Sequence, residues 1–137
     1  MKKRILIALC IVGIVIGIFS VRAGVSGVKN KKSDEEYFLE GVKLIAFELR
    51  EYIDTNDENS FHRAATDVQY LSEEMNFDLG SDFNKEAFAG IVEAFAYSEG
   101  KLRSYAQRLA EAFELIAENP KDEYPYSQFN IVLNSIS

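Results

Sequence analysis

The residues that could carry acid–base chemistry are one histidine, His62, and 22 aspartates and glutamates. A catalytic histidine needs an orienting partner and a nucleophile or a substrate pocket beside it. On a helical wheel His62 lies about 100° away from the apolar side of its segment, which places it on a solvated flank. The acidic pairs Glu35/Glu36 and Glu73/Glu74 fall at helix ends or exposed turns, where solubility explains their charge. We therefore expect no catalytic site.

Metal chemistry is equally poorly supported. Residues 54–59 begin like a calcium-binding EF-hand loop, but the sixth position, normally glycine, is Asn59, and the twelfth, normally a bidentate acid, is Ala65. A di-iron site in a helical bundle needs Glu-x-x-His motifs, and the single histidine is in none. The only cysteine, Cys10, excludes an intrachain disulfide and a cysteine metal site. The sequence thus predicts neither a metal nor a cofactor.

Charge divides the chain into two parts. Residues 1–32 carry seven bases and no acid, whereas residues 33–137 carry eight bases and all 22 acids, a net charge of −14. A body this anionic repels phosphate and lacks the basic patch that nucleic-acid binding needs. We therefore expect no nucleic-acid partner.

An uncharged run rich in Ile, Val and Leu occupies residues 5–21. As a helix it would be about 26 Å long, short but sufficient to cross a bilayer core, so it predicts a single membrane anchor. The alternative is a signal peptide cleaved after Ala23, because such peptides have a shorter apolar core and a small residue at the cleavage site. In either case the ordinary export route places residues 24–137 outside the cytoplasm.

Two glycines in this run, Gly13 and Gly17, form a G-x-x-x-G pattern. Glycines on one helix face let two backbones approach closely, so this pair predicts helix packing within the membrane. The chain then divides into residues 1–23 as the anchor or signal segment, 24–32 as a basic tether, and 33–137 as an acidic helical domain.

The elements that must position the exported residues are predicted to be helices. Four segments place apolar residues three and four positions apart, and no segment alternates with a period of two, so the fold is expected to be all-α. The first two helices are expected over residues 33–54 and 60–75, each with a serine that can cap its start. A short helix is expected over residues 125–136.

The third segment, residues 84–118, has the most regular pattern in the chain. Its apolar residues alternate four and three apart through four heptads, as in a coiled coil. We predict one long helix here, with the shorter helices folded back along it in an antiparallel three- to four-helix bundle. Glu99 is the one charge in the apolar seam, and Gly100 beside it weakens the helix. Either Glu99 pairs with Arg103 in a continuous helix, or Glu99 and Gly100 form a hinge.

Four large apolar side chains are expected to lie off the core-facing stripes. Phe47 lies opposite the stripe of the first helix, with Leu44 nearby, and Tyr70 and Tyr97 lie off the stripes of the second and third helices. Exposed aromatic residues mark contact surfaces more often than charged residues do. The alternative is that a further helix or a neighbouring subunit covers them.

Together these patterns indicate a membrane-tethered, extracytoplasmic helical module without catalytic activity. Its expected partners are the membrane, through residues 5–21, and another protein or a second copy of the chain. One alternative is a secreted helical binding protein cleaved after Ala23. The other is an accessory subunit of a larger membrane complex.

Overall fold

The computed structural model describes residues 33–137, and every regular element in this part of the chain is a helix. The expected all-α fold is therefore confirmed for this region. No helix among the described residues has the length and apolar character needed to cross a membrane. Outside the described residues lie the anchor or signal segment 1–23 with its span 5–21, Gly13 and Gly17, the cleavage point after Ala23, and the tether 24–32.

Five helices of more than ten residues build the domain. They are α2 (Asp34–Thr55), α3 (Glu58–Glu74), α4 (Asp82–Tyr97), α6 (Ala106–Glu118) and α7 (Glu123–Ile136). Two short elements, α5 (Glu99–Leu102) and the 3-10 turn η1 (Arg103–Tyr105), join α4 to α6.

Short polar side chains begin four of these helices by accepting a hydrogen bond from the backbone, and they are Ser33, Asp57, Ser81 and Asp122. Such caps satisfy backbone N–H groups that have no partner inside the helix. The cap predicted at Ser33 is confirmed. The cap predicted at Ser60 is wrong, because α3 begins earlier and Asp57 is its cap. α4 also begins earlier than the predicted residue 84, with Ser81 as its cap.

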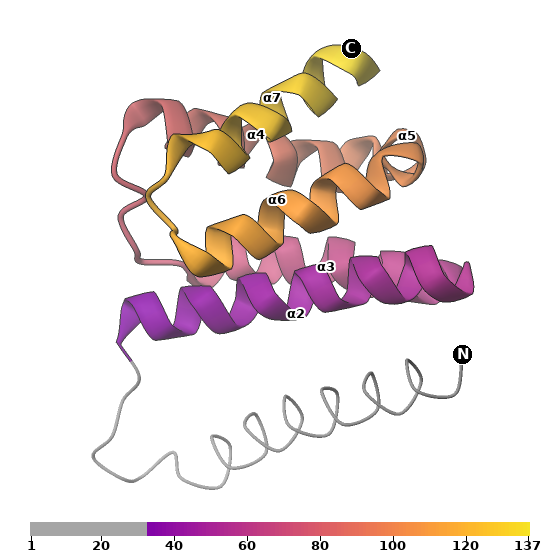
Figure 1. Ribbon diagram of the computed structural model, residues 1–137, viewed down its shortest axis with the longest axis horizontal. Coiled ribbons are helices and arrows are strands. Elements are labelled where there is room, and N and C mark those ends of the chain that lie inside the picture. Colours follow the sequence, from indigo (N-terminus) through magenta and orange to yellow (C-terminus); the bar gives the residue numbers. More distant parts are fainter. Residues whose placement is uncertain (1–32) are drawn as a thin grey trace, which may run out of the picture. The chain divides into compact units, whose positions relative to one another are not determined.

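The helices form two layers with α7 above them (Figure 1). α2 and α3 make the lower layer, α6 and α4 lie over it, and α7 packs against both α4 and α6. Each long helix has its main contacts with two others, so the order α2, α3, α4, α7, α6 closes around one core. The helical bundle is thus confirmed in outline, with one more helix than expected.

The predicted long helix over residues 84–118 is wrong. α4 ends at Tyr97, Ser98 leaves the helical region at φ −135° and ψ 29°, and the chain turns back through α5 and η1 before α6 begins. A straight helix of that length would be about 52 Å long, whereas α2 is about 33 Å. Its ends would project beyond the other helices. The turn instead lets both halves of the heptad pattern bury their apolar residues in the same core.

That core contains the apolar stripes predicted for the helices. Its largest fully buried side chains include Phe38, Ile45 and Leu49 of α2, Phe61 of α3, Ile91 of α4, Leu109, Phe113 and Ile116 of α6, and Tyr126 and Phe129 of α7. The Tyr126 hydroxyl donates a hydrogen bond to the carbonyl oxygen of Pro120 at 2.6 Å, so its polar group is satisfied inside the core.

A buried amide ties together the two loops at one end of the domain. Nδ2 of Asn84 donates to the carbonyl oxygens of Leu79 at 2.9 Å and Lys121 at 3.1 Å. At the opposite end, Nζ of Lys101 approaches the carbonyl oxygen of Ile136 to 3.5 Å. The starts of α4 and α7 are therefore neighbours, as are the end of α7 and the turn after α4, so these two helices run in the same direction.

Candidate interaction surface

Two polar pairs connect the start of α3 to the turn between α4 and α6. Nδ1 of His62 lies 2.6 Å from Oε1 of Glu99, and Nη1 of Arg103 donates to Oε1 of Glu58 at 3.0 Å. The guanidinium of Arg103 also lies 5.9 Å from the ring centroid of Phe61, a cation–π distance. The pair predicted between Glu99 and Arg103 is wrong, because the turn brings both side chains to closer partners on α3.

These contacts account for His62, which is exposed as predicted. A histidine held by a carboxylate is the base half of a hydrolytic triad, and the triad also needs a nucleophile in hydrogen-bond reach of the imidazole. The hydroxyl of Thr66, one turn onward, donates instead to the backbone carbonyl of His62 at 2.9 Å. The contact between His62 and Glu99 therefore joins α3 to the turn after α4.

A buried acid between α2 and α3 was missed by the sequence analysis. Glu48 is 4% exposed, and its Oε2 lies 3.6 Å from Nε of Arg63. Burial, together with a hydrogen bond to the Asp67 carboxylate and the charge of that group, raises the pKa of Glu48 to about 10. The surroundings of Glu48 therefore favour its protonated form over its carboxylate.

The same arginine completes the polar contacts around this acid. Nη2 of Arg63 donates to Oγ of Ser60 at 3.0 Å and to Oε2 of Glu51 at 3.4 Å. The signal for burial was present in the sequence: Glu48 lies three residues after Ile45 and so shares its side of the helix. The spacing alone does not show how deeply this position is buried; the packing of α3 against α2 shows that it is covered.

No group of three or more His, Cys, Asp or Glu side chains in residues 33–137 is arranged to hold a metal ion. The loop tested as a calcium site ends in a helix cap, since the Asp57 carboxylate accepts from the backbone N–H of Asn59 at 3.0 Å. Asn56 before it adopts the left-handed conformation, φ 57°, that ends α2.

The four predicted partner residues come from three helices. Tyr97, at the end of α4, is 85% exposed, and Tyr70 of α3 is 57% exposed. Leu44 and Phe47 of α2 are half-buried and do not belong to the hydrophobic core. The structure thus places the two tyrosines in solvent and leaves Leu44 and Phe47 partly covered.

A second exposed surface, the outer face of α7, was not identified from the sequence. Residues 124–137 contain no charged side chain, although the domain carries a net charge of −14. Tyr124 is 59% exposed and Ile131 is 43% exposed. They are seven residues apart and therefore share one side of the helix. The sequence signal for this exposed face was the absence of charged residues over 124–137. The apolar stripe predicted for this helix identified only the side that is buried.

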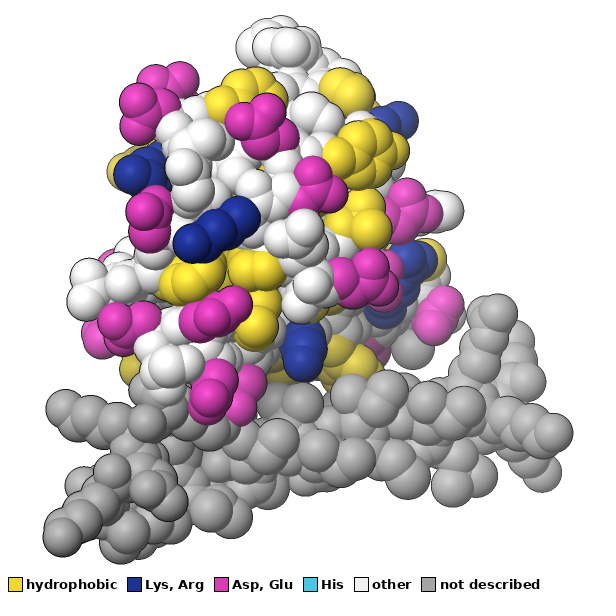
Figure 2. Space-filling view, turned by 60° about the vertical axis from the view of Figure 1, so that its left-hand side comes forward, with side chains coloured by type: hydrophobic (Ala, Val, Ile, Leu, Met, Phe, Trp, Pro, Cys, Tyr) yellow, Lys and Arg dark blue, Asp and Glu magenta, His cyan; other side chains and the backbone are white. Residues whose placement is uncertain are grey.

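Acidic residues collect at the end of the domain where α2, α4 and α7 begin and α3 and α6 end. These helix ends carry Asp34, Glu35, Glu36, Glu73, Glu74, Asp82, Glu118, Asp122 and Glu123. Figure 2 brings this side of the molecule forward and shows acidic side chains spread over it, with fewer basic ones between them.

Comparison of the chain with protein-family models, curated proteins and solved structures found no match.

Proposed function

We propose that this chain is a membrane-tethered helical module that acts by binding protein, without catalysis, and that residues 33–137 work outside the cytoplasm. The observation that carries the proposal is the exposure of large aromatic side chains, with Tyr97 85% exposed. Protein interfaces are enriched in tyrosine and depleted in charge at their centres. In a domain with a net charge of −14, such uncharged aromatic residues are the expected contact points.

The polar side chains support the same proposal. Two polar pairs hold α3 against the turn after α4: His62 with Glu99, and Glu58 with Arg103. Glu48 and Arg63 are used between α2 and α3. Each of these groups has a partner in another element, which is the pattern of a structural network.

Tethering is tested by separating membranes from cells that express the full chain. We expect the protein to stay with the membranes after a carbonate wash and to keep its N-terminal residues in an intact mass measurement. A mature mass that begins at Gly24 would instead identify the secreted alternative. Cross-links formed within the bilayer to a different protein would identify the accessory-subunit alternative.

Partner binding is tested by affinity purification of the full chain in mild detergent. Tyr97→Ser should reduce the yield of a co-purified partner about tenfold without changing the thermal midpoint, because an exposed side chain contributes little to folding. Ile53→Ser is the matched control, since Ile53 is also exposed but lies on α2. Equal recovery of the partner with both variants would contradict a role for Tyr97.

A further inference from the structure

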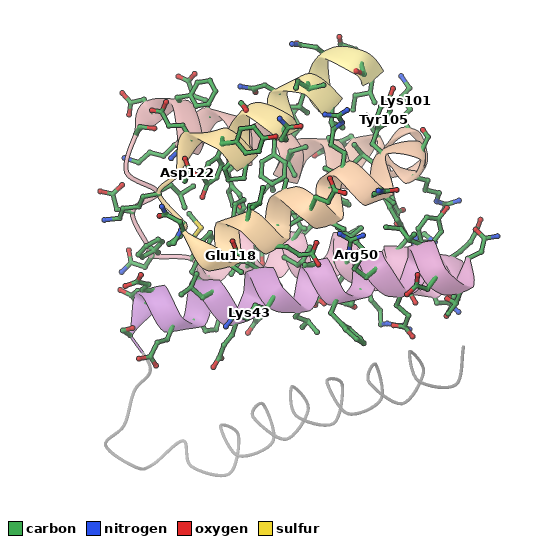
Figure 3. All side chains as sticks on the ribbon, in the orientation of Figure 1. Lys43, Arg50, Lys101, Tyr105, Glu118 and Asp122 are labelled. Atoms are coloured by element: carbon green, nitrogen blue, oxygen red, sulfur yellow. The ribbon has the colours of Figure 1, made fainter. Side chains whose placement is uncertain are left out.

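The outer face of α7 has opposite charges at its two ends. Asp122 and Glu123 stand at its start. Lys101 stands at its end, where its Nζ lies 3.5 Å from the carbonyl oxygen of Ile136. Figure 3 labels Asp122 and Lys101 at opposite ends of this helix. Between them the exposed side chains, Tyr124 and Ile131 among them, are uncharged.

We propose that this face binds a second copy of the chain, with the two α7 helices antiparallel about a two-fold axis near the middle of the helix. The proposal rests on the proposed interaction function and gives it a partner. In such an arrangement Lys101 of each copy faces Glu123 of the other. A two-fold interface is self-complementary, so this one charge pair forms twice.

A second copy fits this face better than a partner of opposite charge does. Two domains of −14 repel each other, and they can approach only where their contact surfaces are neutral. The α7 face provides that neutral surface in both copies. A strongly basic protein would instead be attracted to the acidic end of the domain, where five helix ends bring nine of the 22 acidic residues together.

The size of the face determines where the pairing forms. α7 has 14 residues and is about 21 Å long. A contact along one helix face is at the small end of specific interfaces, so freely diffusing copies associate weakly. Anchoring both copies in one membrane raises their effective concentration and favours the dimer without any added contact.

Zero-length carbodiimide cross-linking of the full chain in its membrane tests the pairing directly. The reagent joins an amine to a carboxylate that touches it. Within one chain Lys101 and Glu123 lie at opposite ends of α7, about 20 Å apart, and cannot be joined. We therefore expect a covalent dimer whose digest contains an amide between Lys101 and Glu123 or Asp122. Absence of a dimer, or a dimer without this amide, overturns the proposal.

Variants test the apolar part of the face and its charged ends separately. Ile131→Glu places a charge against the other copy and should lower the dimer yield about tenfold or more, whereas the matched Ile53→Glu on α2 should not change it. Lys101→Glu and Glu123→Lys should each weaken the dimer severalfold, and the double variant should restore it. A double variant no better than the single ones overturns the antiparallel arrangement.

Two further outcomes are distinguishable. If the dimer survives Ile131→Glu and disappears when Gly13 and Gly17 are replaced by leucine, association occurs through the apolar segment and the α7 proposal is wrong. If Ile131→Glu stays monomeric and still captures another protein through Tyr97, the α7 proposal and the proposed function both hold. A chain that captures neither itself nor another protein fails both.

Discussion

At the scale of single residues, Glu48 shows how one buried acid makes stability depend on pH. Its pKa in the folded domain is raised from 4.5 to about 10, by burial first and by Asp67 second. Between these two pH values the folded state holds a proton that the unfolded chain releases. Because the folded state binds more protons, the free energy of unfolding decreases as pH rises through this range.

Replacing Glu48 by glutamine should remove this dependence. The amide is neutral at every pH, as the protonated acid is, and has nearly the same shape. Glu48→Gln should therefore raise the free energy of unfolding at pH 8 by about 1 kcal/mol or more and change it little at pH 4. Urea titrations followed by circular dichroism at both pH values measure the difference.

Glu51→Gln provides the control, since Glu51 belongs to the same arginine cluster at its more exposed edge. It should change stability by less than about 1 kcal/mol at either pH. A Glu48→Gln variant that is less stable than the parent at pH 8 would show that the negative charge of Glu48, rather than its proton, is the stabilising form.

At the scale of the helices, periodicity predicted which residues are buried but not where a helix stops. The heptad spacing includes Phe95, Leu102, Ala106 and Leu109, which are all buried yet belong to three different helices. A 3-10 turn keeps nearly the same spacing of apolar residues, so the pattern runs through the break unchanged. The helix breaks because a continuous one would be much longer than α2. That comparison of lengths depends on the tertiary structure and is not visible in the local sequence.

Gly100 lies in this break, and a methyl group can be added there. A Cβ built on Gly100 has no heavy atom within 4 Å, and its φ does not require glycine. Gly100→Ala should therefore stabilise the domain by about 0.5–1 kcal/mol, mainly by restricting the unfolded chain. A thermal unfolding scan measures this, and Gly80→Ala should destabilise instead, because Gly80 has φ 98°.

Hydrogen exchange across residues 96–104 is a separate test, which concerns the predicted hinge at Glu99 and Gly100. A local window of fast exchange that slows in Gly100→Ala is the expected result for a hinge, and uniformly slow exchange would contradict it. Glu99→Leu should not stabilise the domain. The apolar seam it would complete is interrupted at Ser98, and the substitution removes the contact with His62.

At the scale of the whole domain, composition predicted the net charge but not where the charged residues lie on the surface. The excess of acid was evident from composition, and the helical wheels correctly placed Tyr70 and Tyr97 in solvent. The concentration of acid at one end arises only when five helix ends meet there. The neutral face of α7 was missed for a similar reason, since an exposed face is defined by which sides of the helix its neighbours cover.

Two charge reversals of the same kind should have opposite effects at this acidic end. Glu74 lies in the last turn of α3, where the helix dipole disfavours an acid, and Glu35 lies in the first turn of α2, where the dipole favours one. Glu74→Lys should raise the free energy of unfolding by about 0.5–1 kcal/mol at low ionic strength.

The matched Glu35→Lys should also reduce repulsion among the surrounding acids, but it places a positive charge where the helix dipole favours a negative one. The free energies of unfolding of the two variants should therefore differ by about 1 kcal/mol. Thermal scans in dilute buffer compare them. Because salt screens both effects, the difference should shrink at high ionic strength. A difference that persists in high salt would point to a change in packing instead.

The buried hydroxyl of Tyr126 gives this domain an internal optical reporter. The chain has seven tyrosines and no tryptophan, so tyrosine dominates its near-ultraviolet spectrum. Burial raises the pKa of Tyr126, whose hydroxyl is held by the carbonyl of Pro120 in the turn between α6 and α7. Exposure of the turn should therefore allow Tyr126 to ionise, and a slow phase of phenolate absorbance in an alkaline stopped-flow measurement would time how quickly this turn opens.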